Sequence, residues 1–235
     1  MIVSDQPVIF GDKVIAAVSS QLDGNMSFSK GDQSETVQNR INFLNKNNLD
    51  YQHATLVQVT YDDIKDFTRY KILQDFHKAE GMLKPTSTIM TDALVVTEPG
   101  HALFLPLADC VGAIIYDAKQ HILMVSHLGR HSTEQQGAAK SIMYLVDQFH
   151  SNIKDIKIWL SPAVGEETYP IKSLNNTGLH EAITTQLLAV NIPRSNIEIS
   201  SIDTATDKNY FSHSQFLAGR RDKDGRFAIV AMMSE

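Results

Sequence analysis

The single cysteine of the chain, Cys110, stands where it could do chemistry. It lies in the segment LPLADCVGAIIYDAKQHILMVSH (residues 105–127), directly after Asp109 and seventeen residues before His127. Such a thiol can be a small buried apolar group, a nucleophile beside an imidazole base, or a metal ligand. A lone cysteine cannot form an internal disulfide, so the thiol does not serve as a cross-link within the chain.

The sequence DAKQ between the two predicted strands indicates that the thiol and the imidazole meet. If the turn centres on Ala118 and Lys119, Cys110 falls directly opposite His127 in an antiparallel hairpin. The Cβ atoms of opposed residues lie about 4.5–5.5 Å apart, which suits two ligands of one metal ion or a thiol–imidazole pair. A slip of one residue would place them on opposite faces of the sheet, so this prediction depends on the turn.

A helix is predicted to start just after His127. Gly129 gives the backbone freedom, and Ser132 and Thr133 are expected to open the helix. The free N–H groups and the dipole of a helix start attract anions. The sequence therefore predicts a thiol, an imidazole, an acid and an anion-binding helix end in one place.

The elements that must position these groups alternate between strands and helices. Asp32 and Glu35, and again Thr133 and Gln136, have capping-box spacing at two predicted helix starts. Mixed elements with hairpins favour an α/β (mixed α+β) fold with a mixed sheet. Region 61–90 is polar and is predicted to form a short helix and a loop. Helices are predicted over 31–48, 133–149 and 178–191, and strands over 13–20, 54–60, 93–97, 102–117, 121–127, 156–164, 197–203 and 227–233.

Composition limits the class of protein. The 235 residues are 43% hydrophobic and 20% charged with a net charge of −6, which is typical of a soluble globular protein, and a single domain over 1–235 is expected. No basic patch indicates nucleic-acid binding. One cysteine favours a reducing compartment, and the start of the chain lacks a signal-peptide pattern, so a cytoplasmic location is expected. No apolar run is long enough to cross a membrane.

Several motifs, in their order along the chain, resemble those of the YfiH-type laccase-domain family. Members are also described as multicopper polyphenol oxidoreductases and as purine nucleoside phosphorylases with adenosine deaminase activity. The motifs are NMSFSKGD (25–32), VQNR (37–40), TDALVVTEPGHALFLPLADC (91–110), HLGR (127–130), LSPAVGEETYPI (160–171) and NYFSHSQFLAGRRDKDGRFAIVAM (209–232).

The resemblance implies a four-layer α/β/β/α sandwich and a zinc ion held by His, Cys and His. Cys110 and His127 match two of these ligands, whereas Thr60, in LVQVTYDD, stands at the third. Threonine is a poor zinc ligand and catalytic zinc usually has three protein ligands, so zinc is expected to be weakly bound or absent. The residues that could replace the missing ligand are His101, His131, His213 and Asp109.

The resemblance further implies phosphorolysis of adenosine or inosine, with inorganic phosphate as co-substrate and adenosine deamination as an additional activity. Cys110, His127 and Asp109 are the predicted catalytic residues, and Arg40 and Asn25 the predicted substrate or phosphate contacts. The expected partner is a small purine nucleoside, with no nucleic acid and no membrane. Three alternatives stay open: an impaired member that binds a purine or a protein, a copper-dependent polyphenol oxidase, and a Cys–His thiol hydrolase.

Overall fold

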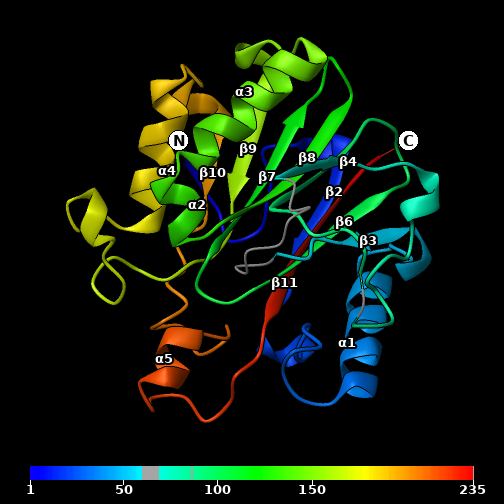
Figure 1. Cartoon of the computed structure of the whole chain (residues 1–235), viewed down its shortest axis with the longest axis vertical. Helices are drawn as coiled ribbons and strands as arrows, with labels where there is room; N and C mark the ends of the chain where they lie inside the picture. Colours follow the sequence, from blue (N-terminus) through cyan, green and yellow to red (C-terminus); the bar gives the residue numbers. More distant parts are fainter. Residues whose placement is uncertain (60–68, 86, 235) are drawn as a thin grey trace.

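Two mixed β-sheets stacked face to face form the centre of the molecule, with helices on both outer sides (Figure 1). The computed structural model describes residues 1–59, 69–85 and 87–234. The seven-stranded sheet has the order β1-β10-β9-β7-β8-β5-β4, and the four-stranded sheet has the order β2-β11-β6-β3. Each sheet contains both parallel and antiparallel pairs. The predicted α/β class with mixed sheets is confirmed.

The strands and α-helices follow one another along the chain with short connections. They are β1 (Ile2–Val3), β2 (Val14–Val18), α1 (Gln33–Lys46), β3 (Ala54–Leu56), β4 (Tyr70–Ile72), β5 (Ala93–Val96), β6 (Ala102–Leu107), β7 (Val111–Asp117), β8 (Ile122–Leu128), α2 (Arg130–Glu134), α3 (Gly137–Phe149), β9 (Ile156–Leu160), α4 (Leu179–Ala189), β10 (Ile197–Ile199), α5 (His213–Leu217) and β11 (Phe227–Met233).

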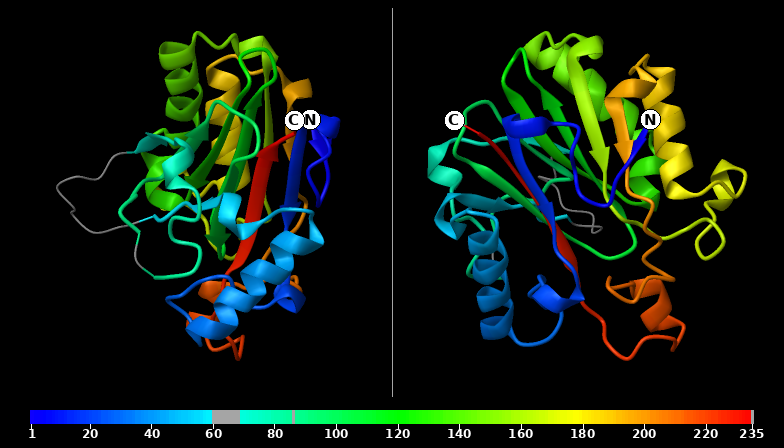
Figure 2. Two further views of the ribbon diagram at one scale, coloured as in Figure 1. Left: turned by 90° about the vertical axis from the view of Figure 1, so that its right-hand side faces the viewer. Right: turned by 180° about the vertical axis from the view of Figure 1, so that it is seen from behind.

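Three apolar cores separate four layers of structure. Helices α3 and α4 pack on the seven-stranded sheet through residues such as Ile142 and Ile183. A second core, which includes Leu105 and Ile114, fills the space between the two sheets. Helix α1 covers the outer face of the four-stranded sheet through a third core, and Figure 2 shows this helix on the side opposite α3 and α4. These layers are the α/β/β/α sandwich that the family resemblance implies.

Helix α1 begins where the sequence predicts. The Asp32 carboxylate accepts a hydrogen bond from the N–H of Glu35 at 2.8 Å, which caps the helix start. Its buried face consists of Thr36, Arg40, Phe43 and Leu44. A cation therefore lies on the inner side of this helix, where an amphipathic pattern would place apolar residues.

The single helix predicted over 133–149 is wrong. Two helices, α2 and α3, meet at Gln136, whose φ of 64° lies in the left-handed region. The helix after His127 therefore starts at Arg130, and Thr133 is buried inside α2 rather than capping α3. The predicted capping box of Thr133 and Gln136 does not form, because a residue with left-handed backbone breaks the helix between them.

The predicted register of the β7–β8 hairpin is also wrong, by two residues. Asp117 pairs with Ile122, and Gly112 pairs with His127, so the connection spans 118–121. The Asp117 carboxylate accepts the N–H groups of Lys119 and Gln120 at 2.9 and 3.1 Å, which favours this longer turn. A shift by an even number of residues keeps side chains on the same face of a sheet. Cys110 therefore stays on the face of His127 but is not opposite it.

The predicted strand over 102–117 is divided between the two sheets. Strand β6 belongs to the four-stranded sheet and β7 to the seven-stranded sheet, and residues 108–110 connect them. Asp109 in this connection has a left-handed backbone with φ of 75°. Cys110 is thus the last residue of an inter-sheet connection, one position before β7.

Short elements escaped the sequence analysis. Strand β4 lies in the region 61–90 that was predicted to hold a helix and a loop, and residues 61–68 of that region lie outside the described residues. Strand β1 and helix α5 were also not predicted. None of the helices in the described ranges combines the length and the apolar character needed to cross a membrane. The single domain over 1–235 stays a prediction.

Candidate functional site

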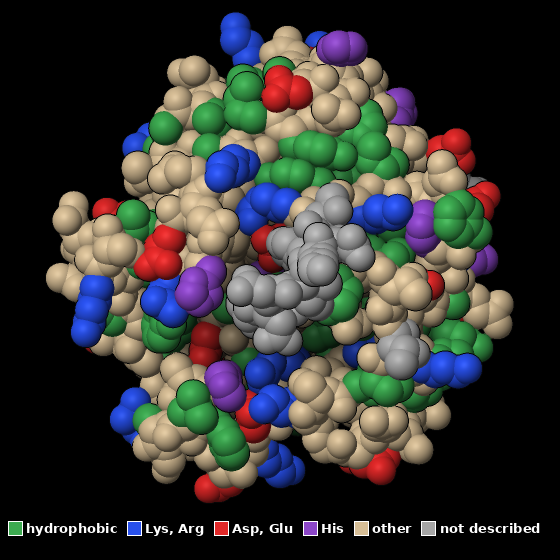
Figure 3. Space-filling model, viewed as in Figure 1, with side chains coloured by type: hydrophobic (Ala, Val, Ile, Leu, Met, Phe, Trp, Pro, Cys, Tyr) green, Lys and Arg blue, Asp and Glu red, His purple; other side chains and the backbone are tan. Residues whose placement is uncertain are grey.

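A cavity of about 660 Å³ opens where the connection 108–110, the start of α2 and the closing segment of the chain approach one another. Its volume lies within the range of about 300–1,000 Å³ that is usual for small-molecule sites. Cys110 and His127 line it. Figure 3 shows Lys or Arg and His side chains gathered around a hollow on this face. The basic side chains in the lining are Arg40, Arg130, His131, His213 and Arg226.

The thiol and the imidazole meet beside Gly129. A Cβ atom built on Gly129 would lie 2.8 Å from Cys110 Sγ and 3.0 Å from His127 Cε1. A side chain at this position would therefore displace both groups, and glycine leaves the space in which they meet. The sequence prediction of a Cys110–His127 pair thus agrees with this geometry, although the predicted register does not.

Asp92, which the sequence analysis missed, lies on the other side of the imidazole. Its Oδ1 is 3.8 Å from His127 Nδ1, and its Oδ2 accepts a hydrogen bond from Arg69 at 2.6 Å. Burial lowers the pKa of His127, but Cys110 and Asp92 raise it more, and the result is a pKa of about 9. A carboxylate behind an imidazole orients the ring. The available signal was position, since Asp92 directly precedes β5, the strand next to β8.

Asp109 does not face the thiol that follows it in sequence. Its Oδ1 accepts a hydrogen bond from Thr204 Oγ1 at 2.8 Å, and its Oδ2 accepts one from the N–H of Ser214 at 2.6 Å. Both oxygens therefore hold the closing segment against the connection 108–110. These contacts correct the predicted catalytic role of Asp109 to a positioning role.

Arg40 is buried and engaged with the backbone. Its Nε and Nη2 donate to the carbonyl of Met26 at 2.8 and 2.7 Å, and its Nη1 donates to the carbonyls of Gly81 and Met82, each at 2.9 Å. Burial lowers the pKa of Arg40 to about 9. Four hydrogen bonds to carbonyl groups occupy most of the five donors that a guanidinium offers. The predicted phosphate contact is corrected to a structural role that joins two loops beneath the cavity.

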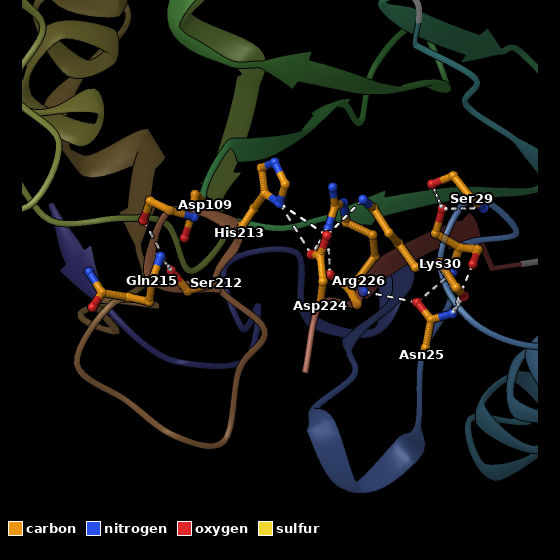
Figure 4. Close-up of polar contacts among 12 residues, drawn as sticks. Asn25, Ser29, Lys30, Asp109, Ser212, His213, Gln215, Asp224 and Arg226 are labelled. Atoms are coloured by element: carbon orange, nitrogen blue, oxygen red, sulfur yellow. Dashed lines mark hydrogen bonds and ion pairs between the residues drawn. The ribbon is translucent and has the colours of Figure 1, made fainter. Parts of the chain in front are cut away.

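Asn25 likewise holds the chain rather than a ligand. Its Oδ1 accepts the N–H of Arg226 at 3.0 Å, and its Nδ2 donates to the carbonyls of Ser27 and Lys30 (Figure 4). The predicted substrate contact of Asn25 is therefore corrected as well. The side chain clamps the loop that follows Asn25 to the strand start at Arg226.

The described residues do not complete a metal site. Within residues 1–59, 69–85 and 87–234, no three His, Cys, Asp or Glu side chains form a group that could hold a metal ion. Thr60, at the third family position, lies outside these ranges. Of the suggested replacements, His131 and His213 line the cavity, whereas His101 does not. The residues present fit neither a three-ligand zinc site nor a set of several copper sites.

His101 is instead buried against Thr55, whose Oγ1 lies 2.7 Å from His101 Nε2. Burial, and to a smaller extent the positive charge of Lys78, lowers the pKa of His101 to about 4. Its ring is thus kept neutral in the folded protein at neutral pH.

A pH-dependent loss of stability is expected from this burial. In the unfolded chain His101 takes up a proton near its ordinary pKa of about 6.5, whereas the folded protein resists protonation down to about 4. The contribution of His101 is therefore complete above pH 6.5 and is lost as the pH falls from 6.5 to 4, with an upper limit of about 3 kcal/mol. Urea titrations of the wild type, His101→Gln and the exposed-site control His150→Asn across this window measure it. A wild-type slope shared by His101→Gln would contradict the assignment.

Comparison with known proteins adds to this geometry. Residues 16–177 match the family model described as multi-copper polyphenol oxidoreductase laccase. A purine nucleoside phosphorylase of Bacteroides thetaiotaomicron is 28% identical over 168 residues, which cover 60% of this chain and 60% of that protein. The purine nucleoside phosphorylase Rv2149c of Mycobacterium tuberculosis is 28% identical over 171 residues, covering 64% of this chain and 66% of that protein. The chain thus matches less than two thirds of the length of these curated relatives.

Two solved structures share the fold. The hypothetical protein YfiH of Bacillus licheniformis superposes with a TM-score of 0.82 at 21% identity, over 94% of this chain and 93% of that one. YlmD from Geobacillus stearothermophilus superposes with a TM-score of 0.85 at 19% identity, over 97% and 94%. These matches extend the similarity in fold over nearly the whole chain.

Proposed function

Because the chain belongs to the multi-copper polyphenol oxidoreductase laccase family, and because the relatives compared above are named purine nucleoside phosphorylases, we propose that it cleaves purine nucleosides with inorganic phosphate. One observation carries the proposal. The cavity holds the Cys110–His127 pair and is lined by several basic side chains, while none of the described lining residues is acidic. Such a site attracts an anion and excludes carboxylates from its reach.

The reaction needs three groups to be brought together. A phosphate oxygen attacks C1′ of the ribose, the C1′–N9 bond breaks, and the bonding electrons leave with the purine, which takes up a proton. The products are ribose 1-phosphate and the free base. Basic side chains hold the phosphate, and Cys110 and His127 supply hydrogen-bonding and proton-transfer groups at the reacting centre.

The apolar part of the cavity suits the purine ring. Phe28, Val57, Pro106 and Tyr169 line it together with Val59. Aromatic and aliphatic surfaces favour a flat heteroaromatic base, and an offset stack on an aromatic ring adds about 0.5–1.5 kcal/mol. A nucleoside thus has an apolar wall for its base and polar groups for its ribose.

The test is release of free base from adenosine and inosine, with and without inorganic phosphate. We expect slow release that requires phosphate and forms ribose 1-phosphate in equal amount. Chromatography of the same samples shows whether adenosine is also deaminated to inosine. Base release at the same rate without phosphate would identify a hydrolase and overturn the proposal.

A second candidate, a binding module without turnover, is favoured by one observation. The two family ligand positions in the described chain, Cys110 and His127, are not joined by a third ligand among the described residues. In that case adenosine should bind, as measured by calorimetry, while no base is released. The Thr60→His variant should then gain zinc, measured by metal analysis after dialysis. Wild-type protein that retains one zinc ion per chain would show that another group completes the site.

A further inference from the structure

A buried carboxylate organises three cations at one wall of the cavity. Asp224 lies 2.7 Å from Lys30 Nζ, 2.8 Å from Arg226 Nη1 and 3.2 Å from His213 Nδ1 (Figure 4). We call these residues the Asp224 cluster. The side chain of Asp224 is only 9% exposed. Burial raises the pKa of Asp224, but its three cationic partners lower it more, so the carboxylate stays ionised.

The cluster presents its cations, and not its carboxylate, to the cavity. His213 and Arg226 line the cavity, as do Ser27 and Ser29, whereas Asp224 does not. Arg226 uses Nη1 for Asp224 and for the carbonyl of Gly225, and no hydrogen bond within the described chain engages its Nε or Nη2. These N–H groups remain for a ligand. Two permanent cations, Lys30 and Arg226, against one carboxylate leave this wall positively charged.

The two segments that carry the cluster are fixed to each other. The clamp made by Asn25 joins the loop of Ser27 and Lys30 to the backbone of Arg226, and the N–H of Met26 donates to the carbonyl of Arg226 at 2.9 Å. Arg40 holds the carbonyl of Met26 from below. Side chains held in place before a ligand arrives lose less freedom on binding, which favours affinity.

The opposite wall is less prepared. Arg130 contacts its neighbour His131 at 3.3 Å, and the side chain of His131 is 59% exposed, against 20% for that of Arg226. Both walls carry positive charge, but only the Asp224 cluster has its cations oriented by a buried partner. A tetrahedral anion with several oxygens is the ligand that an arginine with adjacent hydroxyl and imidazole groups recognises best.

We propose that Arg226, His213, Ser27 and Ser29 form a phosphoryl-binding subsite, with Asp224 as the positioning residue behind it. The subsite deepens the proposed function, in which its ligand is the inorganic phosphate that attacks the ribose. A phosphoryl group could also arrive on a nucleoside monophosphate. The shared chemistry is a dianionic tetrahedral group.

Inorganic phosphate binding to the full chain tests the subsite without requiring turnover. Calorimetry at constant ionic strength in chloride should show binding to the wild type, and roughly tenfold weaker binding to Arg226→Gln and to Asp224→Asn, the size expected for loss of a charged hydrogen-bonding group. Lys223→Gln is the matched control, because it removes a positive charge from an exposed neighbour outside the lining. It should bind phosphate as the wild type does.

Further arms separate the outcomes. If Asp224→Asn does not fold, His213→Gln and Ser29→Ala carry the test, each with an expected loss of several-fold in phosphate affinity. Tighter binding of adenosine 5′-monophosphate than of phosphate plus adenosine would assign the subsite to a nucleotide. Phosphate affinity that is unchanged in Arg226→Gln, or lost instead in Arg130→Gln, would overturn the subsite. Phosphate bound through Arg226 without any base release would leave the subsite standing and refute the phosphorylase function.

Discussion

Replacing either Cys110 or His127 with alanine is expected to lower the rate of phosphate-dependent base release by roughly 10²–10³-fold. Both side chains line the cavity and meet beside Gly129, so each acts at the place where the nucleoside bond breaks. Loss of a group that acts in the transition state lowers kcat more than it raises KM for the nucleoside. Initial rates at several adenosine and phosphate concentrations separate the two constants.

Because the pair acts as a unit, the double variant should be little slower than either single variant. The control is His121→Asn in the turn of the same hairpin, where the histidine is exposed and has a left-handed φ of 52° that asparagine tolerates. It should retain wild-type rates. Unchanged turnover in both alanine variants would place the catalytic centre elsewhere in the chain.

Replacing Arg40 with methionine is expected to lower the free energy of unfolding by about 3–5 kcal/mol. The side chain is 1% exposed and satisfies the buried carbonyls of Met26, Gly81 and Met82. Methionine fills similar space but leaves these carbonyls without their donors. Lysine keeps the charge but not the planar arrangement of donors, so Arg40→Lys should fall between the wild type and Arg40→Met. Urea denaturation at neutral pH measures all three.

The control for this series is Arg194→Met, at an exposed position, which should change the free energy of unfolding by less than about 0.5 kcal/mol. A different result would restore the original sequence prediction. If Arg40→Met were as stable as the wild type but bound phosphate much more weakly, Arg40 would be a ligand-binding residue after all.

The longer elements were predictable because their signals are local. Helix α1 begins at its predicted cap, and β11 spans the predicted residues 227–233. Strands β1 and β4 contain two and three residues and owe their existence to neighbours far away in sequence. The break at Gln136 and the turn at Asp117 depend on single backbone choices, which periodicity does not report.

The candidate site was predictable in part for the same reason. Cys110 and His127 belong to one hairpin, so even a wrong register kept them on one face. Asp92 and the Asp224 cluster reach the site from other strands and loops, and only the folded chain brings them there. Asn25 and Arg40 were assigned to the correct region but to the wrong role, because sequence alone does not show that their polar atoms are occupied by backbone groups.

The connection 108–110 ties the thiol to two sheets at once, whereas the imidazole belongs to a single strand of one sheet. The spacing between the two reactive groups therefore depends on how the sheets are stacked, and that stacking is set by the core that contains Leu105 and Ile114. A mutant library restricted to the cavity lining would leave this determinant untouched. Random libraries selected for altered turnover should recover substitutions in the interlayer core, and the size of a single buried methyl group becomes a means of adjusting the catalytic pair from a distance.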